Sequence, residues 1–526
     1  MKYEYFELNK YEEIAKKEKV STLTAKAIEA YNLSNDKNLE LLTPYKYEGM
    51  NEVVSYLLKA VNNKKKIMVY GDYDVDGICS VSILKRMFTL MNTNIGYYLP
   101  NRYKDGYGIN EEKVKEIHKK GYEVIICIDN GINANEPIEL ARNLGMDVIV
   151  LDHHELMGDI PNCNHYLHPN LSNFTEYNMC ASSVAFFLSI ALLGYEDETC
   201  AIYAGIATLS DVMPLTSQNK LLLKNAINLL NKHKHNNLDL LVNKEDYDEN
   251  ILSMQLIPKL NSVGRMINDI RVNNVIKYLF SDDANEIKYL LNFINNCNDE
   301  RKNMSNAFFN NVSKEEFKEV IIVKDNSLLE GVCGIVASRL SHNFNLPAIV
   351  FALSEDKEFY KGSARSIDSI NIVESLSKLD YLVSFGGHKK AAGITIHRED
   401  FDKFKSDLFN IIKNQEKEEI VNKVILLDKD ELTYKSYIEL LKYGPFGEGN
   451  PYPVFAIENI DKSLVGFSKD QKHLIIKLNG DVSLLAFNLA CQYQEKYNNY
   501  RSIFTLDKNN LLKNKLSCKC IDVLGG

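Results

Sequence analysis

Three aspartates stand at alternate positions in the segment GDYDVDG, residues 71–77. Asp72, Asp74 and Asp76 follow an apolar run, and carboxylates so close together repel one another unless cations neutralise them. Hard divalent cations take oxygen ligands, and an added imidazole favours manganese over calcium. The spacing also matches the start of an EF-hand calcium loop, but that loop needs glutamate at its twelfth position, where this chain has Ile83. The segment therefore predicts a divalent-metal site of another kind.

Three further segments carry side chains of the same type. Asp129 lies in IDNGI, although Asp-Asn-Gly is also a common turn sequence. Asp152, His153 and His154 are consecutive in LDHHE, a combination that is uncommon in a protein core. Asp211, in ATLSDVMPL, fits a helix cap as well as a metal ligand. Together, the four segments predict a site for two ions about 4 Å apart, which can activate water and stabilise the leaving oxygen of a phosphoryl displacement.

The elements before these segments place them at one edge of a sheet. Apolar strands are expected at Ile67–Tyr70, Val124–Ile128 and Val148–Leu151, and helices follow the turns after the first two. Strands that alternate with helices predict a parallel sheet with both faces covered. Ligands of such sheets lie at the carboxyl ends of the strands, where the acidic segments fall.

The rest of the chain changes character twice. After Asp211 the pattern is helical, and a stretch from about 282 to 318 with few glycines or prolines predicts a long connecting helix. A second α/β unit starts near Val320. The last 100 or so residues carry short strands at the spacing of a small all-β barrel or sandwich.

Composition sets limits on the class of protein. A chain of 526 residues is too long for one ordinary domain, and its ten cysteines form no CxxC pair. The first thirty residues lack the apolar core of a signal peptide, and no apolar run reaches the length of a membrane span, so we expect a cytoplasmic protein with no membrane partner. The net charge of −9 argues against indiscriminate nucleic-acid binding, but a basic groove can be local.

The four acidic segments resemble the successive motifs of the DHH phosphoesterase superfamily, which takes its label from the Asp-His-His triplet. NSVGRM, GVCGIVASRL, KGSARSI and FGGHKKAAG resemble the linker and DHHA1 parts of RecJ exonucleases. PNRYKDGYGI resembles the segment after their first motif, and GPFGEGNPYPVF resembles the entrance to their oligonucleotide-binding (OB) barrel. The resemblance runs from about residue 45 nearly to the C-terminus.

The resemblance implies an α/β fold. A parallel-sheet DHH domain would be joined by a long helix to a smaller α/β DHHA1 domain, and a C-terminal all-β OB-like barrel would follow. The implied boundaries are an N-terminal segment at 1–45, the DHH catalytic domain at 46–215, a helical connector at 216–318, the DHHA1 domain at 319–415 and the OB-like domain at 420–526.

The resemblance also implies roles for single residues. The metal ligands would be Asp74, Asp76, Asp129, His153 and Asp211, with Asp72 as an additional carboxylate. Asp152 and His154 would complete the catalytic set, and His154 would touch the scissile phosphate. The residues that hold the nucleic-acid backbone or its terminal phosphate would be Arg102, Tyr107, Asn261, Arg265, Ser363, Arg365 and His388. A guanidinium fork matches the geometry of phosphate better than an ammonium group does.

The sequence departs from the family pattern at three places. Leu328 and Leu329 stand where Trp-His is usual, and Ala364 replaces a glycine in GSARS. The segment 180–183, Cys-Ala-Ser-Ser, stands where a glycine-rich helix start is common. These departures affect the grip on the substrate and no metal ligand.

The implied function is a single-strand-specific 5′→3′ DNA exonuclease that releases 5′-mononucleotides with two Mn²⁺ or Mg²⁺ ions, in DNA repair and recombination. The expected partner is single-stranded DNA, with a helicase or single-strand-binding protein as a further candidate, and the domain plan is compatible with a monomer. Phe455, Phe467 and Phe487 are candidates for stacking on bases, although barrel core is the commoner fate of such aromatics.

Two alternatives remain at this point. A DHH/DHHA1 phosphodiesterase acting on oligoribonucleotides or cyclic dinucleotides would lack the C-terminal barrel. A non-catalytic DNA-binding replication scaffold would have lost carboxylates from the metal set, and this chain keeps them all.

Overall fold

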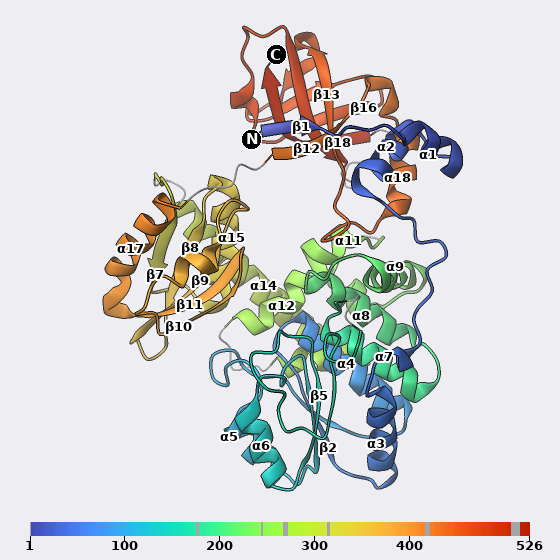
Figure 1. The fold of residues 1–526 in the computed structure, drawn as a ribbon, viewed down its shortest axis with the longest axis vertical. Coiled ribbons are helices and arrows are strands. Elements are labelled where there is room, and N and C mark those ends of the chain that lie inside the picture. Colours follow the sequence, from blue (N-terminus) through green and yellow to red (C-terminus); the bar gives the residue numbers. More distant parts are fainter. Residues whose placement is uncertain are drawn as a thin grey trace. The chain divides into compact units, whose positions relative to one another are not determined.

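The computed structural model describes residues 2–174, 178–243, 246–266, 272–312, 316–415, 421–506 and 516–525. The chain forms two compact units (Figure 1). The central unit contains Leu42–Asp211 and Asn225–Ile420, and the terminal unit contains Met1–Leu41, Val212–Lys224 and Val421–Gly526. This grouping differs from the five segments expected from the sequence, because both ends of the chain fold into one unit.

A five-stranded parallel sheet forms the first half of the central unit, in the order β3-β2-β4-β5-β6. Its strands are β2 (Ile67–Tyr70), β3 (Gly96–Tyr98), β4 (Val124–Ile128), β5 (Asp147–Leu151) and β6 (His165–Leu167). Every residue of β2 and β4 is buried, as in parallel strands covered on both faces. The predicted parallel sheet is therefore confirmed, and only the third expected strand begins one residue earlier than expected.

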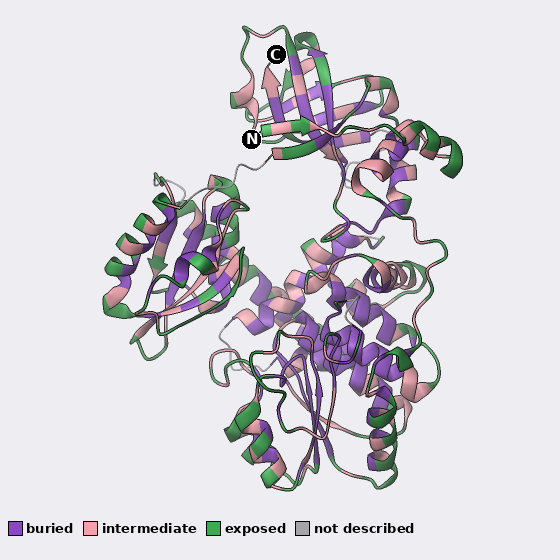
Figure 2. Ribbon diagram, in the orientation of Figure 1, coloured by how far each residue is buried: buried purple, intermediate pink, exposed green. Residues whose placement is uncertain are grey.

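Helices cover both faces of this sheet (Figure 1). On one face, apolar side chains of α5 (Glu111–Lys119) and α6 (Asn135–Asn143) join the strands in one hydrophobic cluster. The other face is covered by α3 (Met50–Asn62), α4 (Val75–Leu90) and α7 (Ala181–Leu193), and α8 (Glu198–Ser210) packs against α4 and α7. Helices α4, α7 and α8 are buried over most of their length, which suits their almost continuous apolar sequences (Figure 2).

A helical segment leads to the second half of the central unit. Its helices are α9 (Ser217–Lys232), of which the residues up to Lys224 belong to the terminal unit, α10 (Asn236–Asp239), α11 (Glu249–Ile251), the π-helical turn η3 (Leu252–Leu256), α12 (Ile257–Arg265), α13 (Asn273–Phe280) and α14 (Ala284–Val312). Helix α14 has 29 residues and corresponds to the connecting helix expected over 282–318. Part of that expected range, residues 313–315, lies outside the described residues.

The second half of the central unit is a smaller α/β domain with a mixed sheet in the order β10-β11-β9-β8-β7. The strands are β7 (Ile321–Asp325), β8 (Ala348–Leu353), β9 (Phe359–Arg365), β10 (Ser384–His388) and β11 (Ala391–His397). Its helices are α15 (Glu330–Phe344), α16 (Ile372–Leu376) and α17 (Phe401–Lys413). The apolar face of α17, with Phe404, Leu408 and Ile412, packs into the core of this sheet.

The terminal unit is built on an eight-stranded sheet in the order β1-β12-β13-β17-β18-β16-β15-β14. The strands are β1 (Lys2–Tyr5), β12 (Val421–Leu426), β13 (Val454–Asp461), β14 (Val465–Phe467), β15 (Leu474–Lys477), β16 (Val482–Ala486), β17 (Asn499–Leu506) and β18 (Leu516–Gly525). Helices α1 (Tyr11–Glu18), α2 (Thr22–Tyr31) and α18 (Tyr434–Leu440) accompany the sheet. The expected C-terminal all-β domain is confirmed.

The N-terminal segment completes this β domain. Strand β1 pairs in parallel with β12, and Leu23 and Ala27 of α2 belong to the hydrophobic core of the barrel. Lys26 forms an ion pair with Glu431 at 2.8 Å. An amphipathic helix must bury its apolar face, and the barrel supplies the cover that the segment lacks on its own.

The three candidate stacking aromatics have different environments. Phe455 is fully buried in the barrel core, the fate expected to be commoner for these aromatics, so it is not available for base stacking. Phe467 and Phe487 are 40% and 50% exposed and stay available for contact with a ligand. Among the described residues, no helix combines the length and apolar character needed to cross a bilayer.

Candidate metal centre

The turn between β2 and α4 presents the three alternating aspartates. Asp74 caps α4, because its Oδ1 accepts hydrogen bonds from the backbone N–H groups of Asp76 at 3.0 Å and Gly77 at 3.2 Å. A Cβ at Gly77 would lie 2.4 Å from the backbone oxygen of Asp72, so only glycine allows the helix to start so close to the strand end. The cap and the glycine together hold the acidic turn in a compact form.

Asp129 follows β4 in a left-handed backbone conformation, with φ at 61°. Its backbone N–H donates to the carbonyl of Leu151 at 3.0 Å. The side chain of Asn130 is fully buried and donates to the carbonyls of Ile128 at 2.8 Å and of Tyr70 and Gly71 at 3.2 Å. Asn130 therefore ties the ends of β2 and β4 together, which fixes the acidic segments that follow these strands relative to each other.

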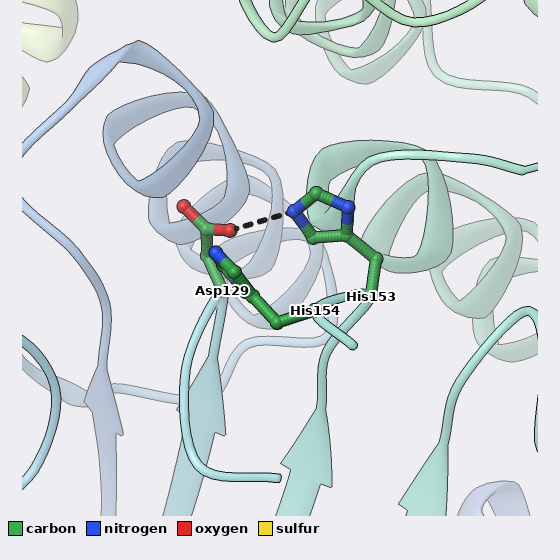
Figure 3. Close-up of side chains that lie close together, drawn as sticks. All are labelled: Asp129, His153 and His154. Carbon is green, nitrogen blue, oxygen red and sulfur yellow. Dashed lines mark ion pairs between the residues drawn. The ribbon is translucent and has the colours of Figure 1, made fainter. Parts of the chain in front are cut away.

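His153 stands at the centre of the carboxylates. Its Nε2 lies 3.2 Å from Oδ1 of Asp129, 3.7 Å from Oδ2 of Asp76 and 3.6 Å from Oδ2 of Asp211, which follows the last residue of α8. Figure 3 shows Asp129 and His153 pointing toward each other from the ends of neighbouring strands. The structure thus brings four chain segments to one place.

All six residues expected to bind metal fall into groups whose donor atoms lie within 4.8 Å of one another. The groups are Asp76, His153 and Asp211; Asp129, His153 and His154; and Asp72, Asp74 and Asp129. Adjacent ligands of an octahedral ion with bonds of about 2.1 Å lie about 3 Å apart, close to the separations around His153. The geometry therefore fits hard divalent cations that accept oxygen ligands and an imidazole.

Two buried oxygens support this fit. Oδ1 of Asp72 and Oδ2 of Asp211 are inaccessible to water and accept no hydrogen bond from any described residue. A buried, unpaired carboxylate oxygen is strongly unfavourable unless a cation or a proton satisfies it. The acidic residues therefore fit the divalent metal ions that the sequence implies.

The electrostatics of the carboxylates point the same way. Burial, followed by repulsion from neighbouring aspartates, raises the pKa of Asp72 and Asp129 well above the usual value and that of Asp211 to about 8. Burial lowers the pKa of His153, so its imidazole stays neutral and keeps a lone pair for coordination. Without cations the site would hold protons, and a divalent ion would displace them.

Asp152 differs from the other carboxylates because its oxygens are already occupied. Oδ1 accepts from His154 Nδ1 at 2.8 Å and from the backbone N–H of His153 at 2.7 Å, and Oδ2 accepts from the backbone N–H of Ile132 at 2.9 Å. Burial opposes its ionisation, but the hydrogen bond and charge of His154 and the backbone hydrogen bond from Ile132 together outweigh burial and lower the pKa of Asp152 to about 2. Asp152 therefore orients His154.

The same contact keeps His154 protonated. Burial disfavours the charged imidazole, but the hydrogen bond and charge of Asp152 outweigh it and raise the pKa of His154 to about 9. The Tyr107 hydroxyl lies 3.1 Å from Nε2 of His154 and 3.2 Å from the backbone oxygen of Asp129. Tyr107 and His154 thus form one edge of the acidic cluster.

Two of the expected phosphate-binding arginines lie close to the acidic turn. Arg265 ends α12 and donates to the backbone oxygen of Gly331 at 3.1 Å. Burial and the nearby charge of Arg102 lower its pKa to about 10, against the attraction of Asp74. Arg102 stacks on the ring of Tyr73 at 4.1 Å, and its buried Nε has no hydrogen-bond partner among the described residues.

The remaining expected residues have varied environments. Arg365 and Ser363 share β9, with Nη1 of Arg365 donating to Ser363 Oγ at 3.0 Å. Asn261 accepts from the backbone N–H of Val75 at 3.1 Å, so this side chain supports the start of α4. His388 ends the exposed strand β10 and belongs to none of the ligand groups formed by the described residues.

Arg301 on α14 is a residue that sequence reasoning missed. Its charge, with those of Arg102 and Arg365, helps to lower the pKa of Arg265, so four arginines share one region. Nη2 of Arg301 donates to Asn298 at 2.9 Å, and its buried Nε donates to no acceptor among the described residues. In the sequence, Arg301 stands in a charged helical stretch, where no signal separates it from a solvated surface arginine.

Three family models match the chain in succession. They are the DHH family N-terminal domain over residues 66–210, the DHHA1 domain over residues 318–414 and the RecJ OB domain over residues 425–519. The fold and the acidic site therefore define a phosphoesterase of the DHH type.

Individual relatives narrow this class. The single-stranded-DNA-specific exonuclease RecJ of Escherichia coli is 30% identical over 450 residues, which are 77% of this chain and 77% of that protein. The protein of the same name from Bacillus subtilis is 33% identical over 84% of this chain, and the match spans only 58% of the relative's length. A crystal structure of RecJ from Thermus thermophilus in complex with Mn²⁺ matches with a TM-score of 0.87 and 25% identity, covering 100% of this chain and 80% of that one. The chain belongs to the RecJ family of single-stranded-DNA-specific exonucleases.

Proposed function

We propose that this protein is a single-strand-specific DNA exonuclease that hydrolyses phosphodiesters from the 5′ end with two Mn²⁺ or Mg²⁺ ions. The observation that carries the proposal is the convergence of Asp72, Asp74, Asp76, Asp129, His153 and Asp211 on one buried position. The ions, when bound, supply a water of lowered pKa and stabilise the charge on the leaving oxygen. The six side chains would hold them there.

His154 would contact the scissile phosphate. The carboxylate of Asp152 accepts a hydrogen bond from its Nδ1 and favours the charged imidazole, which can donate a charge-assisted hydrogen bond to a phosphate oxygen. Asp152 holds Nδ1, which leaves Nε2 as the group that faces the substrate. Tyr107 adds a hydroxyl beside that nitrogen.

The arginines would hold the strand and its terminal phosphate. The charges of Arg102, Arg301 and Arg365 all lower the pKa of Arg265, so the four guanidinium groups influence one another. A buried arginine that lacks full solvation and a carboxylate partner is strongly stabilised when it binds a dianionic phosphate. The 5′ polarity and the release of 5′-mononucleotides rest on the family.

The barrel of the terminal unit would add affinity for the strand. Phe467 and Phe487 are exposed, and Phe487 lies edge-on to His473 with ring centroids 5.4 Å apart. Exposed rings of this kind can stack on bases of any sequence, which suits a non-specific exonuclease. The barrel argues against an oligoribonuclease or cyclic-dinucleotide phosphodiesterase, which would lack this domain. The intact set of metal-binding carboxylates argues against a non-catalytic scaffold.

A reducing compartment suits the protein, because all ten of its cysteines are free and eight of them are buried. We therefore propose that it acts in the cytoplasm, in DNA repair and recombination. A helicase or a single-strand-binding protein that supplies single strands stays a predicted partner.

The test is digestion of single strands labelled at the 5′ or the 3′ end, with Mn²⁺, Mg²⁺ or EDTA. A 5′ label should appear at once as a mononucleotide, a 3′ label should stay on progressively shorter strands, and EDTA should stop both. The matched control is Asp74→Asn, which keeps the helix cap and removes the charge. Metal-independent cleavage, or full activity of Asp74→Asn, would overturn the proposal, and early release of a 3′ label would overturn its polarity.

A further inference from the structure

A set of buried hydroxyl and thiol groups lies among the helices that carry the metal ligands. Helix α7 is almost wholly apolar in sequence, yet it begins with two serines that are fully buried. Five of these groups, all without exposed surface, are Ser80 on α4, Cys180, Ser182 and Ser183 at the start of α7, and Thr208 on α8. A buried hydroxyl is unfavourable unless it is hydrogen-bonded, so the partners of these groups reveal their role.

The first part of the set holds Asp76. The backbone N–H of Ala181 donates to Oδ2 of Asp76 at 2.8 Å, and that of Ser182 donates to Oδ1 at 2.9 Å. The Ser182 hydroxyl donates to the backbone oxygen of Asp76 at 3.0 Å. Since this uses the hydroxyl hydrogen of Ser182, the hydroxyl of Ser80, 3.0 Å away, must be the donor between the two serines. Ser182 therefore holds Asp76 by both its main chain and its side chain.

The second part of the set connects α7 with α8. Thr208 donates its hydroxyl hydrogen to the carbonyl of Ala204 at 2.8 Å, so the contact of 3.3 Å between Thr208 and Ser183 has Ser183 as the donor. Thr208 stands one turn before Asp211, whose backbone N–H donates to the carbonyl of Ala207 at 2.9 Å. The hydrogen bond between Ser183 and Thr208 thus fixes the end of α8 that presents Asp211.

We propose that Ser182 and Ser183 are positioning residues that set the placement of Asp76 against Asp211. These two carboxylates and His153 form one ligand group, so a shift of either would change its affinity for a cation. The start of α7 contacts Asp76 directly, and it positions Asp211 through its hydrogen bond to α8. The inference rests on the proposed function, because it assumes that the group binds a divalent ion.

The experiment compares Ser182→Ala and Ser183→Ala with Ser189→Ala in the full-length protein. Ser189 is a matched control, since it lies on the same helix, is equally buried and donates within that helix to the carbonyl of Phe186 at 2.7 Å. Loss of a group that orients a metal ligand commonly weakens metal binding about 10–100-fold. We expect Ser182→Ala and Ser183→Ala to weaken Mn²⁺ binding about tenfold in calorimetric titration, and Ser189→Ala to leave it unchanged.

Two further readouts separate positioning from stability. The thermal midpoints of the metal-free variants measure structural damage alone, and the electron paramagnetic resonance spectrum of bound Mn²⁺ reports the ligand geometry. If Ser182→Ala does not fold, Thr208→Val tests the connection between α7 and α8, because it keeps the shape of the side chain and removes the hydroxyl that accepts from Ser183. The effects of Thr208→Val and Ser183→Ala on Mn²⁺ affinity should not add in the double variant. Mn²⁺ affinities equal to that of Ser189→Ala, with an unchanged spectrum, would overturn the inference. A wild-type protein that binds no Mn²⁺ would instead refute the proposed function.

Discussion

At the scale of single residues, the site contains carboxylates that we propose bind cations and one carboxylate that holds a histidine. Asp72 and Asp211 each keep a buried oxygen without a hydrogen bond, whereas both oxygens of Asp152 accept hydrogen bonds from neighbouring N–H groups. The same residue type therefore serves two purposes, and the difference lies in hydrogen-bond partners that come from other parts of the chain.

The raised pKa values of the clustered aspartates predict how the stability of the metal-free protein depends on pH. Burial and repulsion keep protons on Asp72, Asp129 and Asp211, so between about pH 4 and pH 8 the folded state binds more protons than the unfolded chain. The free energy of unfolding in EDTA should therefore fall as the pH rises through this window. Asp211→Asn should make the fall shallower, as measured by denaturant unfolding at a series of pH values. Identical slopes for the two proteins would contradict the assignment.

The pairing of Asp152 with His154 predicts a second pH effect. If the charged imidazole contacts the phosphate, activity should decline as the pH rises through the pKa of His154, which is about 9 in the metal-free protein. Asp152→Asn removes the charge that favours the protonated ring, so the decline should move to lower pH. The check is the pH dependence of kcat/KM on a single-stranded substrate at saturating Mn²⁺. An alkaline limb at the same pH in both proteins would show that Asp152 has another role.

At the scale of elements, the close approach of β2 and α4 is the feature that concentrates negative charge. Gly77 permits it, because any side chain there would collide with the backbone of Asp72. The alternation of strand and helix made this arrangement predictable from the sequence. The support that Asn261 gives to Val75, and the closeness of Arg301 to Arg265, were not predictable in the same way, because these contacts join different elements and leave no trace in local sequence patterns.

Gly77→Ala tests this close approach. The added methyl group would force α4 away from the strand end, and overpacking of this kind commonly costs about 1–3 kcal/mol. We expect a lower thermal midpoint and weaker Mn²⁺ binding. Gly480→Ala is the control, because a Cβ at Gly480 meets no atom within 4 Å. Equal behaviour of the two variants would mean that the helix start can shift without affecting the ligands.

At the scale of the whole molecule, the fold classes of the three successive domains could be predicted from the sequence, but the grouping into two units could not. Parallel strands and short barrel strands have local signatures, whereas the packing of α2 against a barrel more than 400 positions further along the chain depends on tertiary contact, as the hydrogen bond from Lys26 to Glu431 illustrates. The apolar positions Leu23 and Ala27 indicate only that the helix needs a partner.

Leu23→Ala tests the joining of the two chain ends. Leu23 is fully buried in the barrel core, and such truncations commonly cost about 2–5 kcal/mol. The free energy of unfolding should fall by an amount in this range, while Mn²⁺ affinity, which belongs to the central unit, should stay the same. Leu58→Ala, at a position that is 41% exposed, is the control. An unchanged stability would show that the N-terminal segment contributes nothing to the barrel.

The number of Mn²⁺ ions bound by the full-length protein tests the metal centre most directly. Calorimetric titration of the EDTA-treated protein should give two ions per chain, and Asp129→Asn should lose at least one of them, because Asp129 belongs to two of the three ligand groups. Binding of no Mn²⁺, or binding that Asp129→Asn leaves unchanged, would contradict the assignment of this acidic cluster as the catalytic metal site.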